Sequence, residues 1–252
     1  ARFDKVRQDG AVRSAALLVV KGVEADGRRR ILDFQAIYGE TKQTWKELFL
    51  RLKERGLHGV LFMVSDNHEG LTGALHEVFP GVVWQRCQTH IGRNVRDKTP
   101  RSHREEMSAR LRDIWTAPDS AEAQRRLRML VELAETWRRG LGDYLEEVVP
   151  EGLSVLVLPE KLRKRLRTTN ALERLNQELK RRTRVVRIFP HLEAYERLAG
   201  TILVHYDERW QEVDRQYVDV GALKEALCGA EPAPLAAASR SGPTAWPPLD
   251  IS

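Results

Sequence analysis

The chain has 252 residues, of which 31% are charged and 42% hydrophobic, with a formal net charge of +6 and a sequence pI near 9.5. This length is enough to bury a substantial core, as one large domain or two smaller ones. No segment has the apolar length of a membrane span and no secretory pattern stands at its start, so we expect no membrane partner and a cytoplasmic, reducing setting. The two cysteines, Cys87 and Cys228, lie in different contexts and imply no disulfide framework. The basic balance favours an anionic partner.

The first part of the chain reads as a run of strands. Residues 2–8, 15–23 and 30–38 predict three successive strands of a meander, with a turn at residues 24–27. The Asp-Gly-Arg sequence at that turn makes the arginines at 28–30 a solvent-facing cluster rather than a binding site.

An amphipathic helix and a second pair of strands follow. Residues 44–55 predict a helix, because apolar side chains recur at helical spacing, namely Trp45, Leu48, Phe49 and Leu52. Residues 60–65 read as a buried strand, 70–79 as a short helix and 82–85 as a further strand. Asp66 then stands at the carboxyl end of a buried strand, where open α/β sheets bind their ligands.

The chain becomes helical and highly charged from residue 91 to about residue 158. Pro118-Asp119-Ser120 predicts a helix start, and residues 148–152 close another helix. Residues 190–215 again read as helical. From Cys228 onward, alanine, proline and serine predict a disordered tail.

The segment from Thr168 to Pro190 carries one carboxylate at the head of a helix and many cations behind it. Leu172, Leu175 and Leu179 form an apolar stripe at helical spacing. A polar stripe lies on another face and holds Glu173, Gln177, Lys180 and Arg184. One interpretation is structural: Asn170 and Glu173 form a capping box, and Glu178 pairs with Arg181 or Arg182. The other is functional: Glu173 binds a metal ion and the cations hold phosphate.

The Cys87-x-x-His90 pair and His68 each have more than one interpretation. Cys87-x-x-His90 has the spacing of two zinc ligands, but no second pair follows at finger-like spacing, and no third group orients a nucleophilic thiol. Packing near an active site and positioning of DNA are the other roles open to this pair. His68, two residues after Asp66, is either a substrate contact or an ordinary loop histidine.

Several motifs, in this order and spacing, resemble the Mutator-type transposases of bacterial insertion sequences. They cover roughly residues 1–212 and comprise Gly39-Glu40 with Trp45, Ser65-Asp66, Gln85-Arg86-Cys87-x-x-His90, Thr168-Thr169-Asn170 with Glu173-Arg174-Leu175-Asn176, and Arg181-Arg182-Thr183-Arg184-Val185-Val186 with Phe189-Pro190.

The resemblance implies an α/β fold, a ribonuclease-H-like mixed sheet with flanking helices and a helical insertion. On this basis residues 1–90 form the first part of the core and residues 91–158 the insertion. Residues 159–220 supply the glutamate helix and the last core helices, and residues 221–252 the tail.

The resemblance also implies a catalytic site. The family uses two aspartates and a glutamate to hold divalent metal, Mg²⁺ or Mn²⁺; Asp66 matches the second aspartate and Glu173 the glutamate. The first aspartate would stand just before Ala1, and Asp4 is a poor substitute because four residues of strand span roughly 13 Å. This predicts an impaired fragment. The expected DNA contacts are the cations Arg86, Arg93, Lys180, Arg181 and Arg184.

The expected function is metal-dependent DNA strand cleavage and strand transfer during insertion-sequence transposition. The alternative is an inactive truncated remnant that only binds DNA, and a metal-dependent nuclease without strand transfer is a weaker third. The expected partners are the element ends and target DNA, with a second copy of the chain as a further candidate.

Overall fold

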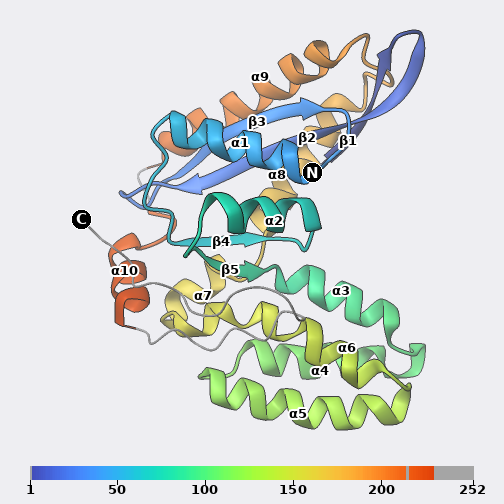
Figure 1. The fold of residues 1–252 in the computed structure, drawn as a ribbon, viewed down its shortest axis with the longest axis vertical. Helices are drawn as coiled ribbons and strands as arrows, with labels where there is room; N and C mark the ends of the chain where they lie inside the picture. The colour runs from blue at the N-terminus through green and yellow to red at the C-terminus, as the bar shows by residue number, and fades with distance from the viewer. Residues whose placement is uncertain (1, 214–215, 230–252) are drawn as a thin grey trace. The chain divides into compact units, whose positions relative to one another are not determined.

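The computed structural model describes residues 2–213 and 216–229, which form a mixed α/β protein (Figure 1). The chain divides into two compact units, which are described in turn. The first consists of Ala1–Val60, His68–Pro80 and Asn170–Val220, and the second of Leu61–Asn67, Gly81–Thr169 and Gly221–Ser252.

The sheet of the first unit is a three-stranded antiparallel meander, as the sequence predicted. Its strands are β1 (Arg2–Gln8), β2 (Ala11–Val23) and β3 (Arg29–Ile37), in the order β1-β2-β3. Asp9 and Gly10 join β1 to β2 with φ angles of 49° and 78°, the left-handed pair that a tight hairpin turn requires. β2 begins earlier than expected because Ala11 already pairs with Gln8.

Four helices belong to this unit: α1 (Lys42–Glu54), α2 (Glu69–Val78), α8 (Asn170–Thr183) and α9 (Leu192–Gln211). The expected apolar face of α1 is confirmed, since Trp45, Leu48, Phe49 and Leu52 are all buried. Thr41 caps α1 by accepting a hydrogen bond from the backbone N–H of Thr44.

The core of this unit lies where α8 and α9 pack on the sheet. Leu175 and Leu179 are buried and Leu172 packs against them, which confirms the predicted apolar stripe. They join side chains from the strands and α9, including Val6, Leu17, Tyr195 and Leu203. The polar stripe of α8 therefore faces away from this core.

Side chains of α9 complete the outer edge of β3. Asp207 accepts from the backbone N–H of Ile31 at 2.7 Å, and Glu196 accepts from that of Ala36 at 2.8 Å. Gln211 donates to the Arg29 carbonyl at 2.8 Å. An edge strand whose polar groups are bonded in this way is a poor template for another strand.

The second unit holds a separate parallel pair, β4 (Phe62–Ser65) and β5 (Val83–Arg86). The single mixed sheet expected from sequence is therefore not seen in the strand pairing of the described residues, which form two sheets. The other edge of β1 pairs with Phe189 instead, through an isolated bridge at Val6.

Helices and no strand occur between Gln88 and Leu166 in the second unit. They are α3 (Gln88–Lys98), α4 (Arg104–Trp115), α5 (Ser120–Trp137), α6 (Leu141–Val148) and α7 (Glu160–Leu166), with short 3-10 turns η1 (Arg101–His103), η2 (Pro150–Gly152) and η3 (Ser154–Val157). Their shared core includes Met107, Ile114, Leu130 and Leu145. Among the described helices, none combines the length and apolar character needed to cross a bilayer.

The first residues of the predicted tail form a helix. Residues 221–229 belong to α10 (Val220–Gly229), a segment rich in helix-forming alanine and leucine in which Leu223 is buried. Assigning these residues to a disordered tail was therefore wrong, and residues 230–252 lie outside the described part of the chain.

Candidate active site

Asp66 follows the last residue of β4 and is half-buried. The buried Ser65 hydroxyl fixes the backbone there, because it donates to the Asp66 carbonyl at 2.7 Å and accepts from the Trp84 indole at 2.9 Å. Across residues 2–213 and 216–229, no hydrogen bond or ion pair reaches the Asp66 carboxylate. A strand-end carboxylate without a protein partner is suited to bind a cation.

The turn from β5 into α3 connects distant parts of the second unit. The fully buried Gln85 accepts from the backbone N–H of Val155 at 2.8 Å and donates to the Arg86 carbonyl at 2.7 Å. Gln88 donates to the Gly152 carbonyl at 2.9 Å. The glutamines of this motif therefore hold the segment of η2 and η3 in place.

Arg86 is committed to an ion pair. Its guanidinium lies 2.6 Å from the Glu151 carboxylate, and its side chain is only 7% exposed. A buried cation that is already paired is poorly placed to grip DNA, so this geometry argues against the phosphate contact expected for Arg86.

Cys87 is fully buried and receives hydrogen bonds at its sulfur. The backbone N–H and the hydroxyl of Thr169 both donate to Sγ at 3.3 Å. Burial raises the pKa of the thiol, but hydrogen bonds from His90 and Thr169 outweigh it and lower the pKa to about 7. His90 thus acts with Cys87 in a local network.

The cations of α8 differ in their surroundings. Arg181 pairs with Glu178 at 2.9 Å, which confirms the structural interpretation at this position, and Arg182 lies over the Tyr206 ring. Lys180 and Arg184 are exposed and form no ion pair with any described residue. Of the expected α8 contacts, these two are the ones available to phosphate.

Glu173 and Arg93 lie on helices of different units. Glu173 is half-buried in the first turn of α8. Arg93 is exposed on α3 and has no ion-pair partner among the described residues.

Glu40 contacts both Trp45 and His68 in the first unit. Its carboxylate accepts from the Trp45 indole at 2.9 Å and lies 3.6 Å from Nδ1 of His68. His68 stands at the start of α2, so a local structural role accounts for it.

Residues that sequence reasoning missed are the partners of the motif side chains. Glu151 and Thr169 complete the Arg86 and Cys87 interactions, and only the Thr168-Thr169-Asn170 motif hinted at one of them. Asp4 forms an ion pair with Arg2 at 2.7 Å. Burial and the Asp4 carboxylate raise the pKa of the Tyr195 hydroxyl.

The expected site residues are shared between the two units. The second unit carries Asp66, Arg86, Cys87, His90 and Arg93. The first unit carries Glu173, Lys180, Arg181 and Arg184.

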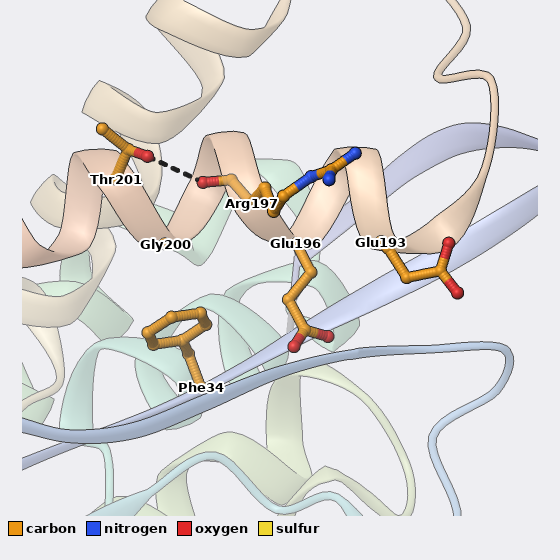
Figure 2. A pocket seen from close by; sticks show the side chains of 6 residues that line it. All are labelled: Phe34, Glu193, Glu196, Arg197, Gly200 and Thr201. Carbon is orange, nitrogen blue, oxygen red and sulfur yellow. Dashed lines mark hydrogen bonds between the residues drawn. The ribbon is translucent and has the colours of Figure 1, made fainter.

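A shallow pocket lies between β3 and α9 (Figure 2). It is lined by Phe34, Glu193, Glu196, Arg197, Gly200 and Thr201, none of which is an expected site residue. The Phe34 ring occupies the space beside Gly200, where a methyl group would come within 2.6 Å of it. The pocket is thus a packing feature rather than the candidate active site.

Together, these features define an α/β protein with a strand-end carboxylate that no described residue bonds, and with exposed cations on and directly after a helix. The chain belongs to the Mutator family of transposases: the model of that family, described as "Transposase, Mutator family", matches residues 1–213.

Similar proteins are transposases of insertion sequences. The chain is 40% identical over 225 residues to the transposase for insertion sequence element ISRM5 of Rhizobium meliloti, covering 89% of this chain and 56% of that protein. It is 40% identical to the IS406 transposase of Burkholderia multivorans, covering 83% and 54%. It is 33% identical to the IS256 transposase in transposon Tn4001 of Staphylococcus aureus, covering 86% and 56%. The chain therefore spans about half the length of these curated relatives.

Proposed function

We propose that this chain is a transposase catalytic core that cleaves and joins DNA strands with the help of divalent metal. The observation that carries this proposal is the Asp66 carboxylate, half-buried at the end of β4 and bonded by none of the described residues. Membership of the transposase family supports our assignment of the substrate, which is the DNA of an insertion sequence and its target.

The donor set fits hard divalent cations. Asp66 and Glu173 offer carboxylate oxygens, which Mg²⁺ and Mn²⁺ prefer as ligands. When bound, such ions would make a water or a 3′-hydroxyl nucleophilic and neutralise the leaving oxygen. We assign Asp66 and Glu173 to one shared site of a ribonuclease-H-like core.

The remaining residues position the substrate. Lys180 on α8 and Arg184, the residue directly after α8, are exposed cations and would hold the phosphate backbone, with Arg93 as a third contact. Cys87 accepts hydrogen bonds from Thr169, the residue directly before α8, and holds that end of the second unit in place. We also assign residues 91–158 to a helical insertion in the core. We expect the protein to act in the cytoplasm.

A strand-transfer assay on a labelled duplex tests the proposal. Two versions of the protein are compared in Mg²⁺ and in Mn²⁺: the chain as it stands, and the chain extended by Leu-Asp and a short strand before Ala1. The extended chain should nick or join DNA, and Asp66→Asn or Glu173→Gln should abolish this activity. Activity that survives both substitutions would overturn the assigned site.

The second candidate function is DNA binding without cleavage. It is favoured by the exposed cations Arg93, Lys180 and Arg184, because contacts to phosphates alone can hold a duplex. Under this alternative, both versions bind duplex DNA and neither cleaves it. Full cleavage by the chain as it stands would exclude the alternative and show that the third carboxylate is dispensable.

A further inference from the structure

An apolar and cationic tip projects from the first unit just after α8. It consists of residues 184–188, Arg-Val-Val-Arg-Ile, which we call the tip loop. Val185 is 78% exposed, the largest fraction among the exposed large hydrophobic side chains of the described residues, and Ile188 is 41% exposed. Val185 exposes most of its surface beside a second exposed branched residue, so the two are available to contact a partner.

The tip loop is held at both ends. On one side Thr183 is fully buried and accepts a hydrogen bond from Arg2, and the backbone N–H of Val186 donates to the Thr183 carbonyl at 2.9 Å. On the other side Phe189 is 2% exposed and exchanges backbone hydrogen bonds with β1, donating to Lys5 at 2.9 Å and accepting from Arg7 at 2.8 Å.

These anchors leave few residues between two fixed points. The chain therefore cannot readily turn Val185 inward, and its exposure is imposed by the backbone. Val186, the neighbouring residue, faces the other way and packs against the core of the first unit. The loop thus presents one apolar side chain and buries the next.

The charges around the tip select its partner. Arg184 and Arg187 flank Val185 and are exposed, and neither forms an ion pair in the described part of the chain. DNA offers an anionic backbone beside apolar base faces, and apolar side chains inserted at a base step are a known way to unstack it. A second copy of the chain would instead bring arginines against arginines, which is unfavourable.

We propose that the tip loop is a DNA wedge: Val185 and Ile188 press against the bases of a step that they help to unstack, while Arg184 and Arg187 hold the flanking phosphates. This inference rests on the proposed DNA-acting function and adds a specific site to it. A strand that is partly unstacked at its cleavage point is easier to bring into line for reaction.

The test compares binding of the full chain to two duplexes of one sequence, fully paired or with a central two-base mismatch, in EDTA so that the metal site plays no part. Because a mismatch removes most of the unstacking cost, the unmodified chain should bind the mismatched duplex about tenfold more tightly. Val185→Ser and Ile188→Ser should reduce that preference to about twofold or less. The matched control is Val204→Ser, at a 52% exposed valine on α9, which should keep the full preference.

Three outcomes overturn the wedge. These are no mismatch preference in the unmodified chain, an unchanged preference in Val185→Ser, or a change of oligomeric state in Val185→Ser without a change in DNA binding. If Lys180→Ala with Arg184→Ala still weakens binding to both duplexes in these cases, the proposed DNA-acting function stands without the wedge. Failure of the unmodified chain to bind either duplex would count against both proposals.

Discussion

The sulfur of Cys87 accepts two hydrogen bonds from Thr169, one from its backbone N–H and one from its hydroxyl, each at 3.3 Å. Thr169 directly precedes Asn170, the first residue of α8. Cys87, directly after β5, therefore holds a residue more than eighty positions later in the chain. This relationship gives the cysteine of the Cys-x-x-His motif a role that needs no zinc.

The Cys87 thiol should titrate near neutrality. Its pKa lies at about 7 because hydrogen bonds from His90 and Thr169 favour the thiolate. Thr169→Val removes the hydroxyl donor and should raise this pKa. Thiolate absorbance near 240 nm, followed against pH in a Cys228→Ser background, measures the change; an unchanged titration would show that the hydroxyl does not contribute.

Stability should increase with pH around the same group. The pKa of Cys87 in the folded chain is about 7, below its ordinary value of 9.0, so between these values the unfolded chain binds more protons. The contribution of Cys87 to the stability of the fold is therefore complete above pH 9 and is lost as pH falls through 7. Relative to Cys87→Ala, the free energy of unfolding should rise over this window by up to roughly 2 kcal/mol. If urea unfolding shows the same difference in free energy between the two proteins at every pH in this window, the prediction is wrong.

The Arg86–Glu151 pair should matter for folding rather than for DNA binding. Glu151→Ala leaves a buried guanidinium unpaired and should destabilise the protein by about 3 kcal/mol. Arg86→Ala removes both the buried charge and its ion pair with Glu151. A double-mutant cycle measured by urea unfolding gives the coupling free energy between Arg86 and Glu151. If Arg86→Ala instead left stability unchanged and weakened DNA binding, Arg86 would be a phosphate contact after all.

The cations at the end of α8 allow unpaired and paired charges to be compared, with Lys180 and Arg184 unpaired among the described residues and Arg181 paired. Lys180→Ala with Arg184→Ala should weaken binding to unrelated duplexes and reduce the slope of log affinity against log salt by about one per lost phosphate contact. Arg181→Ala is the control, because Glu178 already neutralises Arg181, and it should change the slope much less. Equal effects per residue would show that the ion pair opens when DNA binds.

Gly200 should not tolerate a side chain as Gly92 does. A methyl group there would lie 2.6 Å from the Phe34 ring, whereas at Gly92 in α3 it would meet nothing within 4 Å. Gly92→Ala should therefore stabilise the protein by about 0.5–1 kcal/mol through helix propensity. Gly200→Ala should have a free energy of unfolding about 1–3 kcal/mol lower than that of Gly92→Ala, measured by thermal unfolding, because the Phe34 ring must shift. Phe34→Leu combined with Gly200→Ala should recover part of the loss.

Local patterns predicted much of the fold. The spacing of Trp45, Leu48, Phe49 and Leu52 predicted the buried face of α1, and the leucines of α8 predicted its core stripe. Such periodicity works because a helix brings residues three and four positions apart onto one face. The meander of β1, β2 and β3 could also be predicted, because short turns join strands that are neighbours in the sequence.

Long-range partners could not be read from the sequence. Nothing near Gln85 or Arg86 indicates that they bond Val155 and Glu151, because the distance along the chain carries no signal of contact. Arg86 therefore appeared to be a candidate phosphate contact, like any arginine in a polar motif. The helix at Val220–Gly229 was missed because it is short and directly precedes a sequence rich in alanine, proline and serine, with which it was grouped as a tail.

The side chains that complete β3 also affect how the protein is made. Ile31 and Ala36 find their acceptors, Asp207 and Glu196, at separations of 176 and 160 residues. At a synthesis rate of roughly 5–20 residues per second, the ribosome needs about 8–35 s to reach them after it has made β3. During that interval the nascent meander can form its own hairpins, but the backbone groups of its outer strand stay open to any strand nearby. Crowded polysomes would then favour aggregation between nascent chains, and a chaperone that shields this edge would raise the yield of the folded protein.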